Sequence, residues 1–434
     1  MHIQLKQTTK LFAAILFIIS GFSQGCKKSN EAPETGGGPH ITTVTALNPP
    51  APTITSVAPI KGDVYGLVFI NGTNFSTTLA NNTVNFNGTP AILKTATTTQ
   101  LSVLAPAGGT SGPITVTTAG GTATGPVFTY AKHIVYVLGS TASGFCYWKN
   151  GVRTDLPADA NGLNGLVNSI AVSNKDIYVG GAATGLQPAY WKNAGPAVVL
   201  PSNGETGYVQ SIFVSGATVY TAGQLYNPFN SSYILVNWQN STLNYLLNQQ
   251  GTQGVAGLIG GMAVSGGTVY ISGNISTNSG NNMNAAYWVN GTPTVLSNVT
   301  SASANSIFVS GPDLYLAGVI SGINQYWTNG TPTLLKPNPN NRGVAPGRNL
   351  YVSGGNVYVL AQSNGSAKYW RNGKMLSLTT TEFNNSIATC IDGIGNNLYI
   401  GGCSDGNNQI WGYWVNGQFI TIPDATNVYD ILVN

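Results

Sequence analysis

The chain has 434 residues, 42% of them hydrophobic and only 7% charged, with a formal net charge of +4. Globular proteins usually carry roughly 25% charged residues, so Asn, Thr, Ser and Gly supply most of the polarity here. The hydrophobic fraction and the recurring Val, Ile, Tyr and Trp exclude a disordered chain. Together with the low charge, they predict an all-β protein of the extracellular kind.

The start of the chain has the pattern of an export signal. Lys6 and Lys10 form a basic segment, and the apolar run 11–22 that follows them is twelve residues long. That length is too short to span a bilayer comfortably. The pattern therefore predicts that residues 1–25 are a signal peptide.

The signal ends in SQGC, with Gly25 directly before Cys26. This resembles the lipobox of bacterial lipoproteins, although Ser23 stands where that family usually has Leu. The resemblance implies a lipid anchor on Cys26 at the outer membrane or cell surface, with the Pro- and Gly-rich residues 26–50 as a flexible tether. The alternative is an ordinary secretory signal with an incidental cysteine.

Residues 51–131 consist of short alternating segments that Gly, Asn and Pro interrupt every eight to twelve residues, which predicts a β-sandwich. The stretches PTITSVAP, INGTNF, NTVNFNGTPA and SGPITVTTAGG resemble the IPT/TIG family of immunoglobulin-like domains. The resemblance implies an Ig-like domain that serves as a spacer or interaction module. Domains of that family carry no catalytic residues, and none is apparent here.

From residue 132 onward, the chain repeats a unit in which Trp, usually preceded by Tyr, comes shortly before Asn and usually Gly. A typical copy, 305–335, reads NSIFVSGPDLYLAG, a variable stretch, and QYWTNGTPTLL. The period of about 43 residues is typical of the four-stranded blades of β-propellers. The repeated tryptophans are Trp148, Trp191, Trp238, Trp288, Trp327, Trp370 and Trp414.

Each unit is predicted to hold four strands, of which the third ends in Tyr-Trp. The Asn-Gly that follows predicts a type I′ hairpin turn to the fourth strand. Asn193-Ala194 and Asn240-Ser241 are weaker copies of this turn. No Lys/Arg cluster appears on the repeats, which excludes nucleic acid as a partner.

The ends of the repeat region predict how it closes. The region starts at 133–139 with a second strand, and its last residues, 427–434, look like the first strand at 168–173. The C-terminal strand therefore completes the first blade. We expect residues 132–434 to form a seven-bladed β-propeller closed by that strand.

The repeated tryptophans are interpreted as structural, because one indole in each blade fills the space between neighbouring sheets and buries on the order of 150–250 Å². A binding residue copied in every blade, as in some lectins, is the alternative. The YWTNG copy is similar to YWTD propeller repeats, which have six blades and an Asp that is absent here. Kelch-like and galactose-oxidase-like propellers are comparable in architecture, and Gly180-Gly181 and Gly401-Gly402 match their double glycine loosely.

The loops opposite the Asn-Gly turns vary between units, and variable loops on a rigid scaffold usually carry binding. Aromatic residues beside amides suit uncharged sugars, because rings stack on C–H faces and amides bond hydroxyl groups. The alternative is that these residues only pack the loops and make turns. The predicted ligand-binding residues are Tyr226, Phe229, Tyr233, Trp411, Asn407 and Gln409.

Catalysis and metal binding have little support. His2 lies in the signal, His40 in the tether and His133 at the junction of the two domains. The interior of the repeat region therefore has no His for general-base or metal chemistry. Two loop carboxylates such as Glu205 and Glu382 serve glycosidic chemistry only if the fold brings them together. We therefore predict no catalytic residue, no metal and no cofactor.

Three cysteines remain if Cys26 is acylated. Cys390 and Cys403 flank a predicted hairpin and are able to pair, which would leave Cys146 as a free thiol. Their spacing leaves the pairing open.

Three hypotheses for the function follow. The first is a non-catalytic surface lipoprotein that binds a neutral glycan or a protein partner through the variable loops. The second is a structural or adhesive surface protein without a small ligand, and the third is a carbohydrate-active enzyme. Clustering of the loop aromatics favours the first, their dispersal favours the second, and two carboxylates in a central pocket favour the third. The order of anchor, IPT/TIG spacer and terminal domain resembles surface glycan-binding lipoproteins of Bacteroidota, at the level of layout.

Overall fold

The structure is a computed structural model. It describes residues 48–434 apart from 163–164, 230–231, 249, 252–255, 277–282, 298, 300, 338–340, 343, 364–365, 379–385 and 406–409. In this part of the chain, regular structure is β-strand except for one short 3-10 turn, η1 (Leu79–Asn81), so the predicted all-β class is confirmed. Among these residues, none forms a helix with the length and apolar character needed to cross a membrane. The predicted signal peptide and Cys26 lie outside the described residues.

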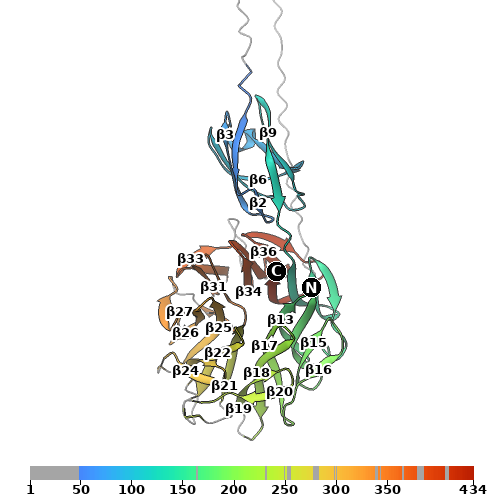
Figure 1. The fold of residues 1–434 in the computed structure, drawn as a ribbon, viewed down its shortest axis with the longest axis vertical. Coiled ribbons are helices and arrows are strands. Elements are labelled where there is room, and N and C mark those ends of the chain that lie inside the picture. The colour runs from blue at the N-terminus through green and yellow to red at the C-terminus, as the bar shows by residue number, and fades with distance from the viewer. Residues whose placement is uncertain are drawn as a thin grey trace, which may run out of the picture. The chain divides into compact units, whose positions relative to one another are not determined.

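The first domain consists of two sheets with the strand orders β1-β3-β7-β6 and β2-β9-β8-β4-β5 (Figure 1). Alternate residues are buried, for example Val68 and Ile70 in β3 and Val84 and Phe86 in β4, because successive side chains of a strand point to opposite faces. They form one core between the sheets, as expected for an Ig-like sandwich. The strands are β1 (Thr53–Ala58), β2 (Lys61–Gly62), β3 (Leu67–Thr73), β4 (Thr83–Phe86), β5 (Thr89–Pro90), β6 (Ile92–Ala96), β7 (Gln100–Leu104), β8 (Gly112–Thr118) and β9 (Gly121–Tyr130).

The repeats form seven further antiparallel sheets within the described residues, here called sheets 1 to 7. Sheet 1 contains β10 (Val135–Thr141), β11 (Gly144–Lys149), β12 (Val152–Asp155) and β38 (Asn427–Val433). Sheet 2 contains β13 (Leu166–Ser173), β14 (Asp176–Ala183), β15 (Gln187–Lys192) and β16 (Ala197–Val199). Sheet 3 contains β17 (Thr206–Ser215), β18 (Thr218–Asn227), β19 (Ser232–Gln239) and β20 (Thr242–Tyr245).

The other four sheets follow in chain order. Sheet 4 contains β21 (Gly257–Ser265), β22 (Thr268–Ser276), β23 (Met283–Val289) and β24 (Thr292–Val295). Sheet 5 contains β25 (Ala302–Ser310), β26 (Asp313–Ile320), β27 (Ile323–Thr328) and β28 (Thr331–Leu334). Sheet 6 contains β29 (Asn341–Arg342), β30 (Leu350–Ser353), β31 (Asn356–Ser363), β32 (Ser366–Arg371) and β33 (Lys374–Ser377). Sheet 7 contains β34 (Ile387–Ile394), β35 (Asn397–Cys403), β36 (Trp411–Val415) and β37 (Gln418–Thr421).

One strand of each sheet contacts its counterpart in the next sheet. These inner strands are β38, β13, β17, β21, β25, β30 and β34, and β34 in turn contacts β38. They therefore form a closed circuit, and the sheets follow one another around it in Figure 1. The C-terminal strand β38 pairs antiparallel with β10, with Ile431 opposite Val137, as the sequence predicted.

The repeated tryptophans are all buried, with at most 2% of each residue exposed. Several also donate their indole N–H to an oxygen of a residue that follows the last strand of the preceding sheet. Each such indole therefore joins two neighbouring sheets, which agrees with the structural interpretation. The bonds are Trp191 to Asp159 Oδ1 (3.0 Å), Trp238 to Pro201 O (2.8 Å), Trp288 to Leu247 O (2.8 Å) and Trp370 to Pro337 O (3.2 Å).

The Asn of each repeat turn makes two bonds to the second strand of its sheet. Asn290 has a φ of 48°, its Oδ1 accepts the Val269 N–H at 2.9 Å, and its own N–H donates to Val269 O at 2.9 Å. Because the amide oxygen as well as the left-handed backbone is needed, Asn persists even where the following Gly is replaced. The same pair of bonds joins Asn150 to Val135, Asn193 to Ile177, Asn240 to Val219, Asn329 to Leu314, Asn372 to Val357 and Asn416 to Leu398.

Replacing Asn290 with alanine is expected to lower the free energy of unfolding by about 1–3 kcal/mol. The change leaves the Val269 N–H without its acceptor and places an ordinary side chain in the left-handed region. The control is Asn290→Asp, which keeps an acceptor oxygen and tolerates this backbone conformation, so it should cost less. Denaturant unfolding measures both variants, and equal losses would show that the turn does not depend on the side-chain oxygen.

Candidate functional site

Three tyrosines meet where the β18–β19 hairpin leaves sheet 3. Tyr226 lies directly opposite Tyr233, with ring centroids 5.6 Å apart and planes at 60°. The ring centroid of Tyr208, in β17, lies 6.3 Å from that of Tyr233, with the ring planes at 71°. Such edge-to-face pairs stabilise one another beyond simple burial. We call Tyr208, Tyr226 and Tyr233 the tyrosine cluster.

Phe229 lies at the tip of the same hairpin. Its backbone N–H donates to Asn227 Oδ1 at 3.0 Å, which shapes the turn, and 97% of the residue is exposed. Tyr233 is also exposed, at 39%. Exposed apolar residues are common singly, so Phe229 and Tyr233 together are only the candidate contact surface of this hairpin.

The sequence predicted Tyr226, Phe229 and Tyr233 but missed Tyr208. Tyr208 belongs to the first strand of the unit, and the antiparallel pairing of Thr206 with Tyr226 brings it to the hairpin. Its aromatic side chain at the start of a first strand was the available signal.

The surroundings of the tyrosine cluster are uncharged. Residues 206–312 contain no Asp, Glu, Lys, Arg or His. Burial raises the pKa of Tyr208, and the neighbouring Tyr233 raises it further, so this hydroxyl stays neutral. Gln224, opposite Tyr208, has a buried Oε1 without a hydrogen-bond partner in the described part of the chain. Neutral rings, hydroxyls and an amide therefore dominate this end of sheet 3.

Trp411 does not belong to this surface. It begins β36 opposite Cys403, is only 8% exposed, and packs in a core with Val428 and Ile431. The expected exposed loop residue is thus a strand residue of sheet 7, so we leave it out of the binding surface. Asn407 and Gln409 lie outside the described residues.

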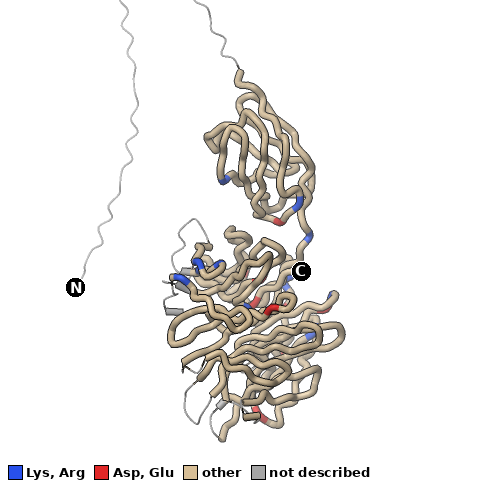
Figure 2. The backbone as a smooth tube through the Cα atoms, turned by 60° about the vertical axis from the view of Figure 1, so that its left-hand side comes forward, with Lys and Arg blue, Asp and Glu red and all other residues tan. Residues whose placement is uncertain are grey.

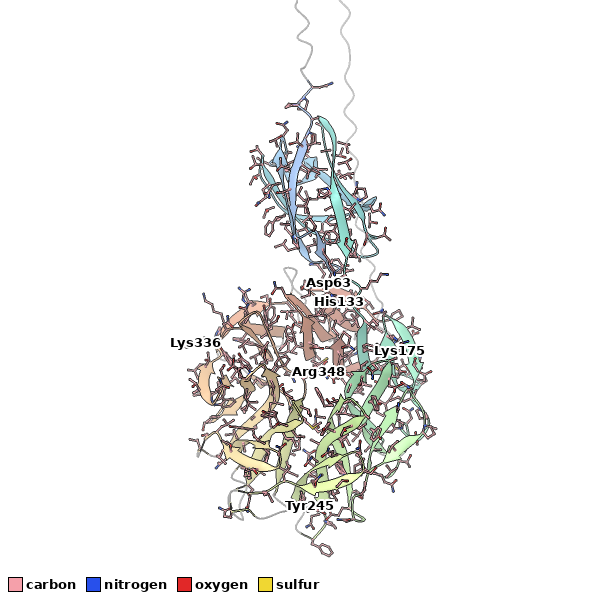
Figure 3. All side chains as sticks on the ribbon, viewed as in Figure 1. Asp63, His133, Lys175, Tyr245, Lys336 and Arg348 are labelled. Carbon is pink, nitrogen blue, oxygen red and sulfur yellow. The ribbon has the colours of Figure 1, made fainter. Side chains whose placement is uncertain are left out.

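A cavity of about 250 Å³ lies inside the circuit of inner strands. Arg348, Asp392 and Asp430 line it, and Figure 3 shows Arg348 in the middle of the surrounding sheets. Arg348 donates from Nε to Asp430 Oδ1 at 3.0 Å and from Nη2 to Ile170 O at 3.0 Å. Burial lowers the pKa of Arg348, but Asp430 and Asp392 outweigh this and raise it overall, so the guanidinium stays charged.

Asp430 is 2% exposed and its oxygens are engaged by the protein. Oδ2 accepts the Ile170 N–H at 2.9 Å, and Oδ1 accepts the Ile431 N–H at 2.9 Å in addition to Arg348. Asp392 Oδ2 accepts the Val433 N–H at 2.9 Å. Burial raises the pKa of Asp392, although Arg348 opposes this. Both carboxylates thus hold the C-terminal strand within the circuit.

The sequence left open whether Cys390 and Cys403 form a disulfide and whether Glu205 and Glu382 lie together. Cys146, Cys390 and Cys403 are free and buried, so Cys390 and Cys403 do not form a disulfide here. Burial raises the pKa of Cys146 to about 12, which keeps it a thiol. Glu205 lies before β17, and Glu382 lies outside the described residues, so this pair stays untested.

Comparison with known proteins assigns one domain. A family model described as the IPT/TIG domain matches residues 52–130, so this part of the chain carries that domain. A comparison with curated proteins gave no match.

Solved structures similar to this chain include three proteins from Bacteroides. A protein of unknown function from Bacteroides thetaiotaomicron has a TM-score of 0.36 and 15% identity, covering 85% of this chain and 99% of the other. An auxiliary nutrient binding protein from the same organism has a TM-score of 0.33 and 12% identity, covering 89% of this chain and 98% of the other. Another auxiliary nutrient binding protein, from Bacteroides ovatus, has a TM-score of 0.31 and 13% identity, covering 81% of this chain and 96% of the other. Because these TM-scores are below 0.5, the likenesses carry no inference about ligand or activity.

Proposed function

We propose that this protein is a non-catalytic surface lipoprotein that binds a neutral glycan. The observation that carries the proposal is the tyrosine cluster beside the fully exposed Phe229. Aromatic rings stack on the C–H faces of sugars, and neutral hydroxyls and amides exchange hydrogen bonds with sugar hydroxyls. The absence of charged residues from 206–312 favours an uncharged ligand.

The proposed scaffold is a seven-bladed β-propeller made of sheets 1 to 7. The closed circuit of inner strands and the pairing of β38 with β10 support this architecture. In this arrangement the β18–β19 hairpin belongs to one blade, and its tip lies at the end opposite the Asn turns. A rigid ring then presents the hairpin at a fixed place.

The proposed location is the outer membrane or cell surface, through a lipid on Cys26. The SQGC motif, the short apolar run 11–22 and the Pro- and Gly-rich tether support it. The IPT/TIG domain at 52–130 then acts as a spacer between anchor and binding domain.

The enzyme alternative has one supporting observation, since Asp392 and Asp430 line the same central cavity. Asp430 is buried and bonded to Arg348 and two backbone N–H groups, so it lacks access to a glycosidic bond. The structural or adhesive alternative predicts no small ligand at all. We therefore place binding at the tyrosine cluster.

The test is a screen of the full-length protein on neutral polysaccharides, followed by affinity measurements on the best ligand. Tyr233→Ala and Phe229→Ala are each expected to weaken binding roughly tenfold, because each removes a stacking surface worth about 1.4 kcal/mol. Tyr315→Ala is the matched control, since Tyr315 lies opposite Thr328 beside an Asn turn and should leave affinity unchanged.

Three outcomes count against the proposal. Failure to bind any neutral polysaccharide would favour the structural alternative. Equal losses for Tyr315→Ala and Tyr233→Ala would place binding elsewhere. Release of reducing sugars from the bound polysaccharide would favour the enzyme, with Asp392→Asn as the variant to examine.

A further inference from the structure

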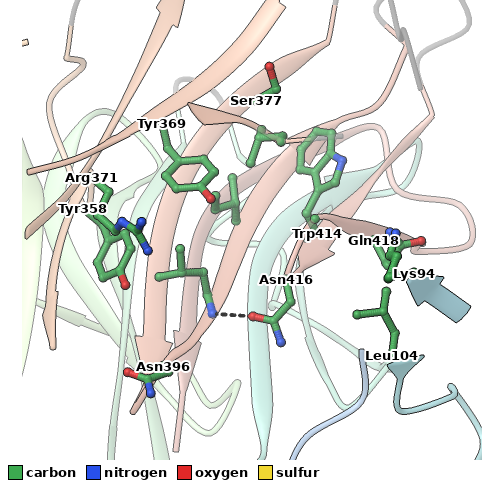
Figure 4. Close-up of a pocket in the computed structure, with 14 residues that line it drawn as sticks. Lys94, Leu104, Tyr358, Tyr369, Arg371, Ser377, Asn396, Trp414, Asn416 and Gln418 are labelled. Carbon is green, nitrogen blue, oxygen red and sulfur yellow. Dashed lines mark hydrogen bonds between the residues drawn. The ribbon is translucent and has the colours of Figure 1, made fainter. Parts of the chain in front are cut away.

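A pocket of about 390 Å³ lies on the side of the Asn turns of sheets 6 and 7. Residues of these two sheets line it, together with Lys94 of β6 and Leu104 of β7. Figure 4 shows Tyr358, Tyr369 and Arg371 of sheet 6 on one side, and Trp414 with Gln418 of sheet 7 on the other. Its volume is within the range of roughly 300–1,000 Å³ that small-molecule sites occupy. The central cavity, at about 250 Å³, is smaller than that range.

The pocket is positively charged. Arg371 and Lys94 line it, and no acidic residue does so among the described lining residues. Arg371 lies directly opposite Lys374 across the β32–β33 hairpin. The backbone of Lys336 pairs with that of Lys374 in an isolated parallel β-bridge. We call Lys336, Arg371 and Lys374 the basic cluster, and Figure 2 shows Lys and Arg gathered at this part of the repeats.

This cluster corrects the sequence-based expectation that no Lys/Arg cluster appears on the repeats. Arg371 and Lys374 face each other only because the turn at Asn372 reverses the chain between β32 and β33. Lys336 belongs to the segment that follows β28, the last strand of sheet 5. Like charges directly opposite one another destabilise a hairpin. In the described part of the chain, none of the three forms an ion pair. A chain with 7% charged residues thus keeps an unfavourable group of cations at the rim of a pocket.

Asn416 in the pocket lining is bonded to Leu398 and Asn397, but four other polar groups of the lining lack partners. Within the described residues, the hydroxyls of Tyr358 and Tyr369 and the guanidinium of Arg371 make no hydrogen bond. The Nε1 of Trp414, a residue only 1% exposed, is likewise without one. Burial raises the pKa of Tyr369, although Arg371 opposes this, so its hydroxyl is a neutral donor. The two tyrosine rings lie 6.4 Å apart.

We propose that this pocket binds a saccharide unit that carries an acidic group, either a carboxylate or a sulfate. Arg371 supplies a planar, permanently charged partner for the acidic group. The tyrosine rings supply stacking surface, and the hydroxyls with Gln418 supply bonds for the sugar hydroxyls. The site differs from the tyrosine cluster in place and in charge, so it takes a second class of glycan.

The test measures binding of the full-length protein to polygalacturonate, dextran sulfate and uncharged dextran at physiological salt. We expect at least one acidic polymer to bind, and the polymer that binds identifies the acidic group. Arg371→Gln should weaken that binding roughly tenfold or more, as expected for loss of a charged hydrogen bond. Lys336→Gln, in the basic cluster but outside the pocket lining, should weaken it less than threefold, by the long-range charge effect alone.

Three results would overturn the proposal. The first is that neither acidic polymer binds, and the second is that Arg371→Gln has no effect. The third is that Lys336→Gln weakens binding as much as Arg371→Gln, which would indicate general attraction to polyanions. Tyr233→Ala should leave binding of the acidic polymer unchanged, so failure here is distinguishable from failure of the neutral-glycan proposal.

Discussion

Replacing Asp430 with alanine is expected to lower the free energy of unfolding by about 3–5 kcal/mol, because it leaves the partly buried charge of Arg348 without its ion-pair partner. The same change removes the acceptor of the Ile170 N–H, and so loosens β38 from sheet 2. Denaturant unfolding of the full-length protein measures the loss. The double variant Arg348→Ala/Asp430→Ala should lose less than the sum of the two single variants, because neither charge is then left alone.

The matched control is the exposed pair of Lys192 and Asp176, whose charged atoms are 2.7 Å apart with side chains 48% and 39% exposed. Asp176→Ala should cost much less stability than Asp430→Ala, because solvent screens exposed pairs. A loss for Asp430→Ala as small as that for Asp176→Ala would mean that the central pair does not hold the circuit together.

Replacing Trp238 with alanine is expected to cost about 3–5 kcal/mol, the usual loss for a large aromatic residue in a core. Trp238 is completely buried and donates to Pro201 O at 2.8 Å, so it both fills the space between sheets 2 and 3 and bonds across it. Thermal or denaturant unfolding measures the change.

The contribution of the indole N–H can be separated from that of the ring. Trp238→Phe leaves Pro201 O without its donor and should cost about 1–3 kcal/mol more than a change of size alone. Trp414→Phe is the control, because the Trp414 N–H has no partner in the described part of the chain. If both phenylalanine variants lose the same stability, the bonds between sheets contribute nothing measurable.

The repeats were predictable from the sequence because their signals are local. The Tyr-Trp-x-Asn phrase combines a strand end, a buried ring and a turn within a few residues, and both Trp288 and Asn290 lie where it indicates. The pairing of β38 with β10 was predictable because the first unit lacks a first strand. The sequence therefore predicted the positions of the repeated Trp and Asn residues, whose roles depend on their neighbours in the chain.

The charged clusters and the place of Tyr208 in the tyrosine cluster were not predictable, because they depend on segments that are distant in the chain. Arg348 occupies the place that Asn168 and Asn305 have in other units, and only the circuit brings it to Asp430. Tyr208 reaches the hairpin through the register of β17 with β18. Trp411 was predicted to be a loop residue, because nothing in the local sequence shows that β36 begins there.

The pairing of β10 with β38 has a consequence for the synthesis of this protein. Ser140 and Thr426 lie side by side, although 286 positions separate them in the chain. A ribosome working at roughly 5–20 residues per second needs about 15–60 s to cover that distance. Throughout this interval β10 has an open edge, the kind of surface through which nascent chains join one another. The topology therefore favours a holding chaperone that shields β10 until its partner strand has been made.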